Sequence, residues 1–212
     1  MDKEQIQKAL HELKQLPKKK FSQSYDLIIN LKNFEVKKSP LDFFVTLHYP
    51  LSKPIKVAAF VDQQLADQAD QHCDITIKEV DFVKYKDIKE AKKLAKGYDY
   101  FIAQATLMPK VAAAFGKSLG VRGKMPNPKL GCVVPPSANL EQLKKKLSSS
   151  VHLTTKKGMN LQCMVGKESQ PESEIIDNIL TIYGAVIKHL PNEMQNIKNI
   201  NLKLTMSKPV NI

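Results

Sequence analysis

A glycine-rich basic segment, residues 115–131, is the part of this chain whose residue types are best suited to binding a ligand. It holds four of the chain's eight glycines and two prolines. This composition predicts neither helix nor strand, but a backbone that turns repeatedly and leaves N–H groups unpaired. Between residues 108 and 131 no residue is acidic and five are basic: Lys110, Lys117, Arg122, Lys124 and Lys129. Such a loop suits a polyanion, because its backbone can approach phosphates closely while the cations supply charge. The alternative is a solvated surface loop.

Motifs for catalysis are missing from the sequence. Gly116-Lys117-Ser118 resembles the end of a phosphate-binding P-loop, but that motif needs a glycine where this chain has Val111, and a strand before it. The chain contains no GxSxG and no HExxH motif, and its histidines lie singly on unrelated elements: His11, His48, His72, His152 and His189. The sequence therefore predicts no catalytic residue and no enzyme.

The cysteines predict neither a disulfide framework nor a zinc site. Cys73, Cys132 and Cys163 are odd in number and widely spaced, and no CxxC occurs. His72 lies beside Cys73, but sequence neighbours usually point apart and no second pair completes a tetrahedral site. We expect no metal and no cofactor.

Length, charge and hydropathy narrow the class of protein. With 212 residues, of which 42% are hydrophobic, the chain can bury a core and is long enough for two small domains. Its 33 Lys+Arg and 21 Asp+Glu give a formal net charge of +12, which favours an anionic partner such as nucleic acid or a membrane surface. No run of about 18 apolar residues exists, and residues 1–5 carry no apolar signal core. We expect a cytoplasmic protein that does not bind a membrane.

The two ends of the chain predict α+β structure. Apolar residues at helical spacing predict a helix over residues 3–16, which Pro17 ends. Two strands are expected over 21–31 and 41–48. Near the C-terminus we expect strands at 151–155 and 161–165, a helix at 172–190 and a last strand at 197–206.

The middle of the chain, between Pro50–Pro54 and Ser148–Ser150, has a different order of predicted elements. Strands are predicted at 55–61, 74–78 and 98–104, and helices at 63–71, 87–96, 107–118 and 140–147. This alternation predicts a parallel sheet with helices on both faces. We therefore expect a discontinuous α+β domain of residues 1–51 and 149–212, and an inserted α/β domain of residues 52–148. Two adjacent joints would permit hinge motion.

Charge is unevenly distributed over these segments. The formal charge is +3 for residues 1–51 (9 − 6), +7 for 52–148 (17 − 10) and +2 for 149–212 (7 − 5). The total formal charge of each segment favours the inserted domain as the polyanion binder. Affinity depends more on clustered geometry than on totals, however, and the lysines over residues 84–96 are typical of a solvated helix face.

Five segments form an ordered set of motifs: Lys20–Leu27, residues 120–131, Lys156–Gly158, Val165–Lys167 and Thr205–Met206. In this order, and over nearly the whole chain, they resemble the L-one family of large-subunit ribosomal proteins in its archaeal and eukaryotic form. The strongest is the segment 120–131, with Val121 where the family normally has proline. After Met206 this chain reads Ser207-Lys208-Pro209, whereas the family usually has Gly-Pro.

The resemblance implies a two-domain, non-enzymatic protein with a Rossmann-like inserted domain. It implies binding to a helical junction in large-subunit rRNA and formation of the mobile stalk near the site from which tRNA leaves the ribosome. In many members it further implies repression of translation through a similar fold in mRNA. The expected partners are thus large-subunit rRNA, the large ribosomal subunit, mRNA and exit-site tRNA, and no obligate homo-oligomer is expected.

The resemblance also assigns site residues. The principal RNA contact is expected on the first domain, at Lys20, Phe21, Ser24, Lys156, Gly158, Thr205, Met206, Ser207 and Lys208. An aromatic ring can pack on a ribose or base, hydroxyls can bond to 2′-hydroxyls, and lysines can pair with phosphates. Competing interpretations are that Phe21 is a core residue and that Thr205 and Met206 simply end a strand.

A secondary contact with RNA or tRNA is expected at Lys117, Arg122, Lys124 and Lys129, against the alternative of a purely structural loop. Two rival functions remain open at this point. One is an RNA-binding repressor that acts off the ribosome. The other is a small phosphate-ester enzyme that uses the inserted domain.

Overall fold

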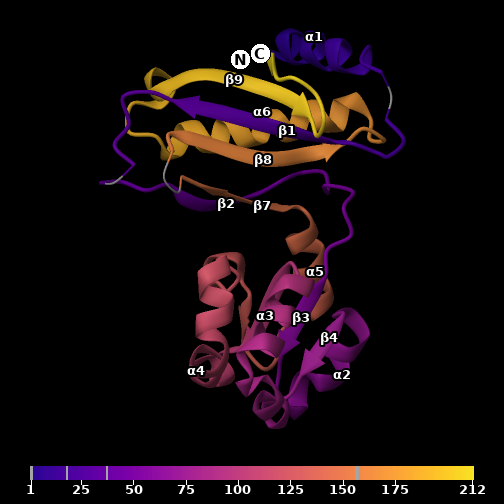
Figure 1. The fold of residues 1–212 in the computed structure, drawn as a ribbon, viewed down its shortest axis with the longest axis vertical. Coiled ribbons are helices and arrows are strands. Elements are labelled where there is room, and N and C mark those ends of the chain that lie inside the picture. The colour runs from indigo at the N-terminus through magenta and orange to yellow at the C-terminus, as the bar shows by residue number, and fades with distance from the viewer. Residues whose placement is uncertain (1, 18, 37, 156–157) are drawn as a thin grey trace. The chain divides into compact units, whose positions relative to one another are not determined.

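The computed structural model describes residues 2–17, 19–36, 38–155 and 158–212, and the chain separates into two compact units. Unit 1 consists of Met1–Lys53 with Ser149–Ile212, and unit 2 of Pro54–Ser148 (Figure 1). The assignment of these parts as an RNA-binding domain and an inserted domain stays a prediction.

Unit 1 is built on a four-stranded antiparallel sheet. Its strand order is β10 (Val210–Asn211), β9 (Ile197–Leu204), β1 (Ser24–Leu31) and β8 (Asn160–Lys167). Burial alternates along β1, because successive side chains of a strand point to opposite faces. The buried face of β1 carries Tyr25, Leu27, Ile29 and Leu31.

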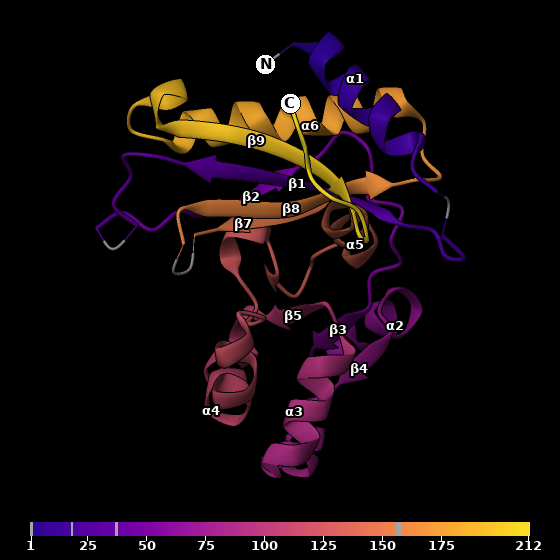
Figure 2. The same ribbon diagram turned by 45° about the horizontal axis from the view of Figure 1, so that its top comes forward.

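Two helices cover the buried face of this sheet, α1 (Lys3–Lys14) and α6 (Glu172–His189), and Figure 2 shows both on the same side of the strands. In α1 the buried residues recur at helical spacing: Ile6, Ala9, Leu10 and Leu13. Acidic residues begin α6 and Lys188 and His189 end it, which complements the helix dipole. Lys14 and Glu172 form an ion pair that links the two helices at 2.5 Å.

A two-stranded antiparallel ribbon, β2 (Asp42–Thr46) with β7 (Ser150–Thr154), completes unit 1. Phe43, Val45, Val151 and Leu153 turn inward and join the same core cluster. Phe43 stacks on His189 with ring centroids 3.9 Å apart. The ribbon is thereby fixed to the end of α6.

Unit 2 contains a parallel sheet of order β4 (Ile75–Ile77), β3 (Val57–Phe60), β5 (Tyr100–Gln104) and β6 (Val133–Val134). Every residue of β3 is buried, so both faces of the sheet are covered. On one face, Phe60 packs against Phe101 and Phe115. The helices pack as two pairs, α3 (Ile88–Gly97) with α4 (Met108–Leu119), and α2 (Gln63–His72) with α5 (Leu140–Ser148).

The predicted fold class is confirmed, and the differences lie at element ends and in a few short elements. The strand predicted over 197–206 ends at Leu204, because the backbone turns there and the Ser207 hydroxyl accepts a hydrogen bond from the Leu204 N–H at 2.8 Å. The strand predicted from residue 21 begins at Ser24. The sequence missed β6 and β10, which have two residues each and carry no periodicity, and the 3₁₀ helix η1 (Glu79–Lys86).

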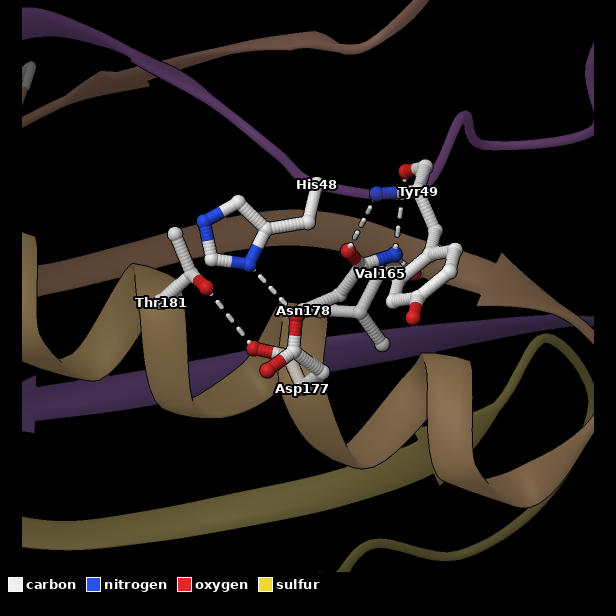
Figure 3. Close-up of polar contacts among 6 residues, drawn as sticks. All are labelled: His48, Tyr49, Val165, Asp177, Asn178 and Thr181. Atoms are coloured by element: carbon white, nitrogen blue, oxygen red, sulfur yellow. Dashed lines mark hydrogen bonds and ion pairs between the residues drawn. The ribbon is translucent and has the colours of Figure 1, made fainter.

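The segment that leads out of β2 is fastened to α6 by side chains (Figure 3). Asn178 is fully buried, and its amide accepts from the Tyr49 N–H at 3.3 Å and donates to the carbonyls of Tyr49 at 3.2 Å and Val165 at 3.0 Å. His48 Nδ1 lies 2.6 Å from a carboxylate oxygen of Asp177. Gln170 donates to the Pro50 carbonyl at 2.8 Å. The chain is thus held in place up to residue 50.

We expect Asn178→Ala to lower the free energy of unfolding of unit 1 by about 2–3 kcal/mol, because it leaves buried backbone groups without partners. The measurement is urea unfolding followed by circular dichroism. Asn192→Ala is the matched control, since Asn192 is exposed and its described hydrogen bonds all involve its backbone. Equal stability of the two variants would show that the amide does not hold this segment.

Candidate nucleic-acid interface

The start of β1 and the ends of β8 and β9 lie next to one another at one end of the sheet of unit 1. Strand β1 is antiparallel to both β8 and β9, so Ser24 at its start faces Lys167 at the end of β8, and Tyr25 faces Leu204 at the end of β9. Figure 2 shows the arrowheads of β8 and β9 pointing to the same end, opposite to that of β1. Residues from both ends of the chain are thereby brought together.

Hydrogen bonds join the segments at this end of the sheet. The Thr205 N–H donates to the Ser24 carbonyl at 3.1 Å, and the Ser24 N–H donates to the Thr205 hydroxyl at 3.1 Å. Ser207 closes the next turn through its bond to Leu204. Its hydroxyl also lies 3.0 Å from the Lys208 carbonyl, so Ser207 orders the turn rather than facing solvent.

Gln23 is a residue of this site that the sequence analysis missed. It is only 4% exposed, and its side-chain oxygen accepts from the Met206 N–H at 3.1 Å. Its own carbonyl accepts from the Glu168 N–H at 2.9 Å. A signal was present in the sequence, because Gln23 is a polar residue two places before Tyr25, in phase with the buried positions of β1.

The strand-end cluster, as we name it, comprises Lys20, Phe21, Ser24, Thr205, Met206, Ser207 and Lys208. Ser24 and Ser207 are half-buried, and the other five side chains are exposed. Phe21 is 51% exposed and Met206 67%, so the interpretation of Phe21 as a core residue is wrong. Thr205 and Met206 lie in a turn, so they do not end a strand either. The cluster offers an aromatic ring, hydroxyls and two ammonium groups to a partner.

A buried tyrosine supports the cluster from below. Burial, with Glu168 and Glu172 nearby, raises the pKa of Tyr25 to about 12. Its hydroxyl has no hydrogen-bond partner among the described residues. Tyr25 therefore stays neutral and acts by packing beneath the strand ends.

Gly158 does not join the strand-end cluster. It lies just before β8, at the end where the Leu31 N–H donates to the Met159 carbonyl at 2.7 Å. The eight residues of β8 separate it from Lys167 by roughly 25 Å, at about 3.3 Å per residue. Lys156, predicted to act with it, lies outside the described residues.

The glycine-rich segment of unit 2 differs from the prediction. Residues 115–119 are the end of α4, followed by the 3₁₀ helices η3 (Gly120–Arg122) and η4 (Pro128–Leu130). Only Gly123 and Gly131 adopt positive φ, at 66° and 78°. The expectation of many unpaired N–H groups is wrong, because most are bonded within the segment: those of Gly123, Lys124, Lys129, Leu130, Gly131 and Cys132.

The cations of this segment divide into two groups. Lys124 is half-buried, and its ammonium donates to the carbonyls of Tyr98 at 2.5 Å and Ala95 at 3.2 Å, at the end of α3. Lys117, Arg122 and Lys129 are exposed. Three cations are therefore directed to solvent, while Lys124 holds the segment against α3.

Catalytic and metal chemistry finds little support in the described residues. Burial raises the pKa of the Cys73 and Cys132 thiols to about 11 and that of Cys163 to about 12, so none is a thiolate nucleophile at neutral pH. In the described part of the chain, no three His, Cys, Asp or Glu side chains group as metal ligands would. None of its helices is long and apolar enough to span a membrane.

The fold defines a class, a protein with an α/β and an α+β unit, and the exposed groups at its strand ends are of kinds that suit a polyanion. Comparison with known proteins identifies the family within this class. A sequence model of the ribosomal protein L1p/L10e family matches residues 13–208. The chain belongs to this family, as its motifs predicted.

Archaeal relatives extend over almost the whole chain, and each is named large ribosomal subunit protein uL1. The relative from Nanoarchaeum equitans is 37% identical over 199 residues, which cover 92% of this chain and 93% of the relative. The relative from Methanothermococcus thermolithotrophicus is 36% identical over 216 residues, which cover 100% of this chain and 99% of the relative. The relative from Thermofilum pendens is 36% identical over 200 residues, which cover 92% of this chain and 86% of the relative.

We expect Lys124→Ala to destabilise unit 2 by about 1–2 kcal/mol, because it removes a charged donor from the carbonyl end of a helix. The measurement is the shift in the denaturation midpoint. Lys129→Ala is the control, as it removes the same charge from an exposed position of the same segment. A similar shift for both variants would mean that the Lys124 bonds contribute nothing beyond charge.

Proposed function

We propose that this chain is a structural constituent of the large ribosomal subunit and binds large-subunit rRNA through the strand-end cluster. Membership of a ribosomal protein family supports the first part. The observation that carries the second is the convergence of Phe21, Ser24 and Thr205 at one end of the sheet, joined by the Ser24–Thr205 hydrogen bonds. No catalytic step is part of this function.

The chemistry of the cluster suits RNA. Phe21 exposes a ring that stacks on a base or packs on a ribose. The Thr205 hydroxyl accepts from the Ser24 N–H at 3.1 Å and donates to the Ser24 carbonyl at 3.4 Å, which leaves one lone pair of its oxygen to accept from a 2′-hydroxyl. Lys20 and Lys208 are exposed beside these groups and pair with phosphates. Because Ser207 orders the turn, it acts on RNA through the positions of its neighbours.

The two units take different parts in this proposal. Residues 1–51 and 149–212 form the RNA-binding domain, and residues 52–148 form a Rossmann-like inserted domain. Together with rRNA they form the mobile stalk near the tRNA exit site. Gly158 serves as a separate contact, because it lies at the opposite end of the sheet. A similar RNA fold in mRNA would occupy the same cluster and repress translation.

The inserted domain makes the secondary contact in this proposal. Lys117, Arg122 and Lys129 are exposed and touch exit-site tRNA, where their charges neutralise phosphates. Lys124 supports that contact indirectly, since its ammonium is bonded to α3. A repressor acting off the ribosome is the alternative function, and co-sedimentation with large subunits in cell lysate separates the two.

We expect Thr205→Val and Phe21→Ala each to weaken binding of an rRNA junction fragment by about 1–3 kcal/mol, the range for a specific polar contact or a stacked base. Filter binding at fixed salt measures this effect. Thr205→Ser should restore most of the affinity, because it keeps the hydroxyl.

The matched control is Met159→Ala, an exposed residue at the other end of the sheet. Unchanged affinity in both Thr205→Val and Phe21→Ala, with loss in Met159→Ala, would move the rRNA site to that end.

Arg122→Ala and Lys129→Ala should cost the isolated rRNA junction less affinity than Thr205→Val does, because they lie in the other unit. The same titration measures this difference. If either costs as much as Thr205→Val, the inserted domain is part of the primary rRNA site.

A further inference from the structure

Unit 2 contains an open pocket of about 420 Å³ between the beginning of α3 and the turn that follows α4. Six residues line it: Ile88, Lys92, Lys117, Ser118, Val121 and Arg122. Three are cations and two are aliphatic. This combination differs from the strand-end cluster, which offers an aromatic ring and hydroxyls.

The three cations of the pocket keep their charge available. Among the described residues, Lys92, Lys117 and Arg122 form no ion pair, whereas other cations of unit 2, such as Lys84 and Lys110, are paired with acids. Acidic groups on α3 do not neutralise the pocket. Glu90 is two residues from both Ile88 and Lys92, which places it on another side of the helix.

Asp87 precedes the pocket residue Ile88, and its carboxylate is used locally. One oxygen accepts a hydrogen bond from the Lys89 N–H at 2.9 Å and caps α3. The pocket therefore presents net positive charge to solvent.

Two aliphatic side chains form part of its rim. Val121 is 90% exposed and Ile88 is 56% exposed, and both border the same pocket. Solvent contact of two aliphatic side chains at one spot is unfavourable, and a partner that covers them gains from their burial.

We propose that this pocket binds an acidic protein segment in which an aliphatic side chain is flanked by carboxylates. The aliphatic side chain lies between Ile88 and Val121, and the carboxylates pair with Lys92, Lys117 and Arg122. This site lies in the other unit from the strand-end cluster, so it is independent of rRNA binding. It shares Lys117 and Arg122 with the proposed tRNA contact, so segment and tRNA compete.

The lining favours a peptide over a nucleic acid. Phosphates pair with the cations but gain nothing from the two aliphatic side chains, and none of the six lining residues offers an aromatic ring to a base. An aliphatic residue flanked by carboxylates complements both the rim and the charge.

The test uses fluorescence anisotropy with the full chain and two fluorescein-labelled probes. One is a peptide of about twelve residues, rich in Asp and Glu, with two leucines at helical spacing, and the other replaces both leucines by serine at equal charge. We expect the leucine peptide to bind about tenfold more tightly, and the Ile88→Ser/Val121→Ser variant to remove this difference. Both substitutions are at exposed positions, so the fold is retained.

Charge is tested with Lys92→Ala against Lys93→Ala, two exposed lysines of α3 of which only Lys92 lines the pocket. Lys92→Ala should weaken the leucine peptide about fivefold or more and Lys93→Ala should not. Equal binding of the two peptides, or unchanged leucine-peptide binding in the serine variant, overturns the proposal. A third arm uses bulk tRNA, and loss of tRNA affinity in the serine variant without loss of peptide affinity would assign the pocket to nucleic acid.

Discussion

The pairing of β1 with β8 on one side and β9 on the other is the interaction on which the rest of unit 1 depends. The bonded groups are far apart in sequence, since 181 positions separate Ser24 from Thr205 and 145 separate Gln23 from Glu168. Closing such loops costs conformational entropy, and the burial of one face of β1 beneath α1 and α6 offsets it. A slip of one residue would expose Tyr25 and Leu27 and separate Ser24 from Thr205. Core and site thus share one register.

That dependence explains which parts could be predicted from the sequence. The helices and most strands follow from local periodicity, as in the buried alternation of Tyr25, Leu27 and Ile29, and their order indicated two kinds of structure in one chain. The end of β9 could not be predicted in this way, because residues distant in sequence fix the turn after Leu204. Gln23 holds the Met206 N–H, and only the folded sheet places these two together. The exposure of Phe21 is likewise a result of tertiary packing.

For the glycine-rich segment, the amino-acid composition led to a prediction of unpaired N–H groups that composition alone cannot determine. Glycine and proline predict turns, but they do not reveal whether the N–H groups of those turns face a ligand or each other. Here Asn127 decides the outcome, since its side chain accepts from the Lys129 N–H and its carbonyl accepts from Leu130 and Cys132. The backbone of the segment is largely bonded to itself, and the groups that it exposes to a partner are the side chains of Lys117, Arg122 and Lys129.

The total charge of a segment is, for a related reason, a poor guide to which unit binds a polyanion. The middle of the chain carries the largest formal excess, but several of its cations are already engaged: Lys84, Lys110, Lys144 and Lys145 with carboxylates, and Lys124 with carbonyls. Exposed ion pairs contribute little stability, yet they lower the potential that a polyanion meets. In unit 1 the lysines at the strand ends are fewer, but Lys20 and Lys208 stand beside an exposed ring and an oriented hydroxyl. Specific binding of RNA needs both kinds of group. Lysines position the RNA by contacting its phosphates, and the ring and the hydroxyl then discriminate among RNA partners. In the function that we propose, the unit with less charge therefore holds the more selective surface, and the cations of the other unit recognise partners by charge and a small apolar rim.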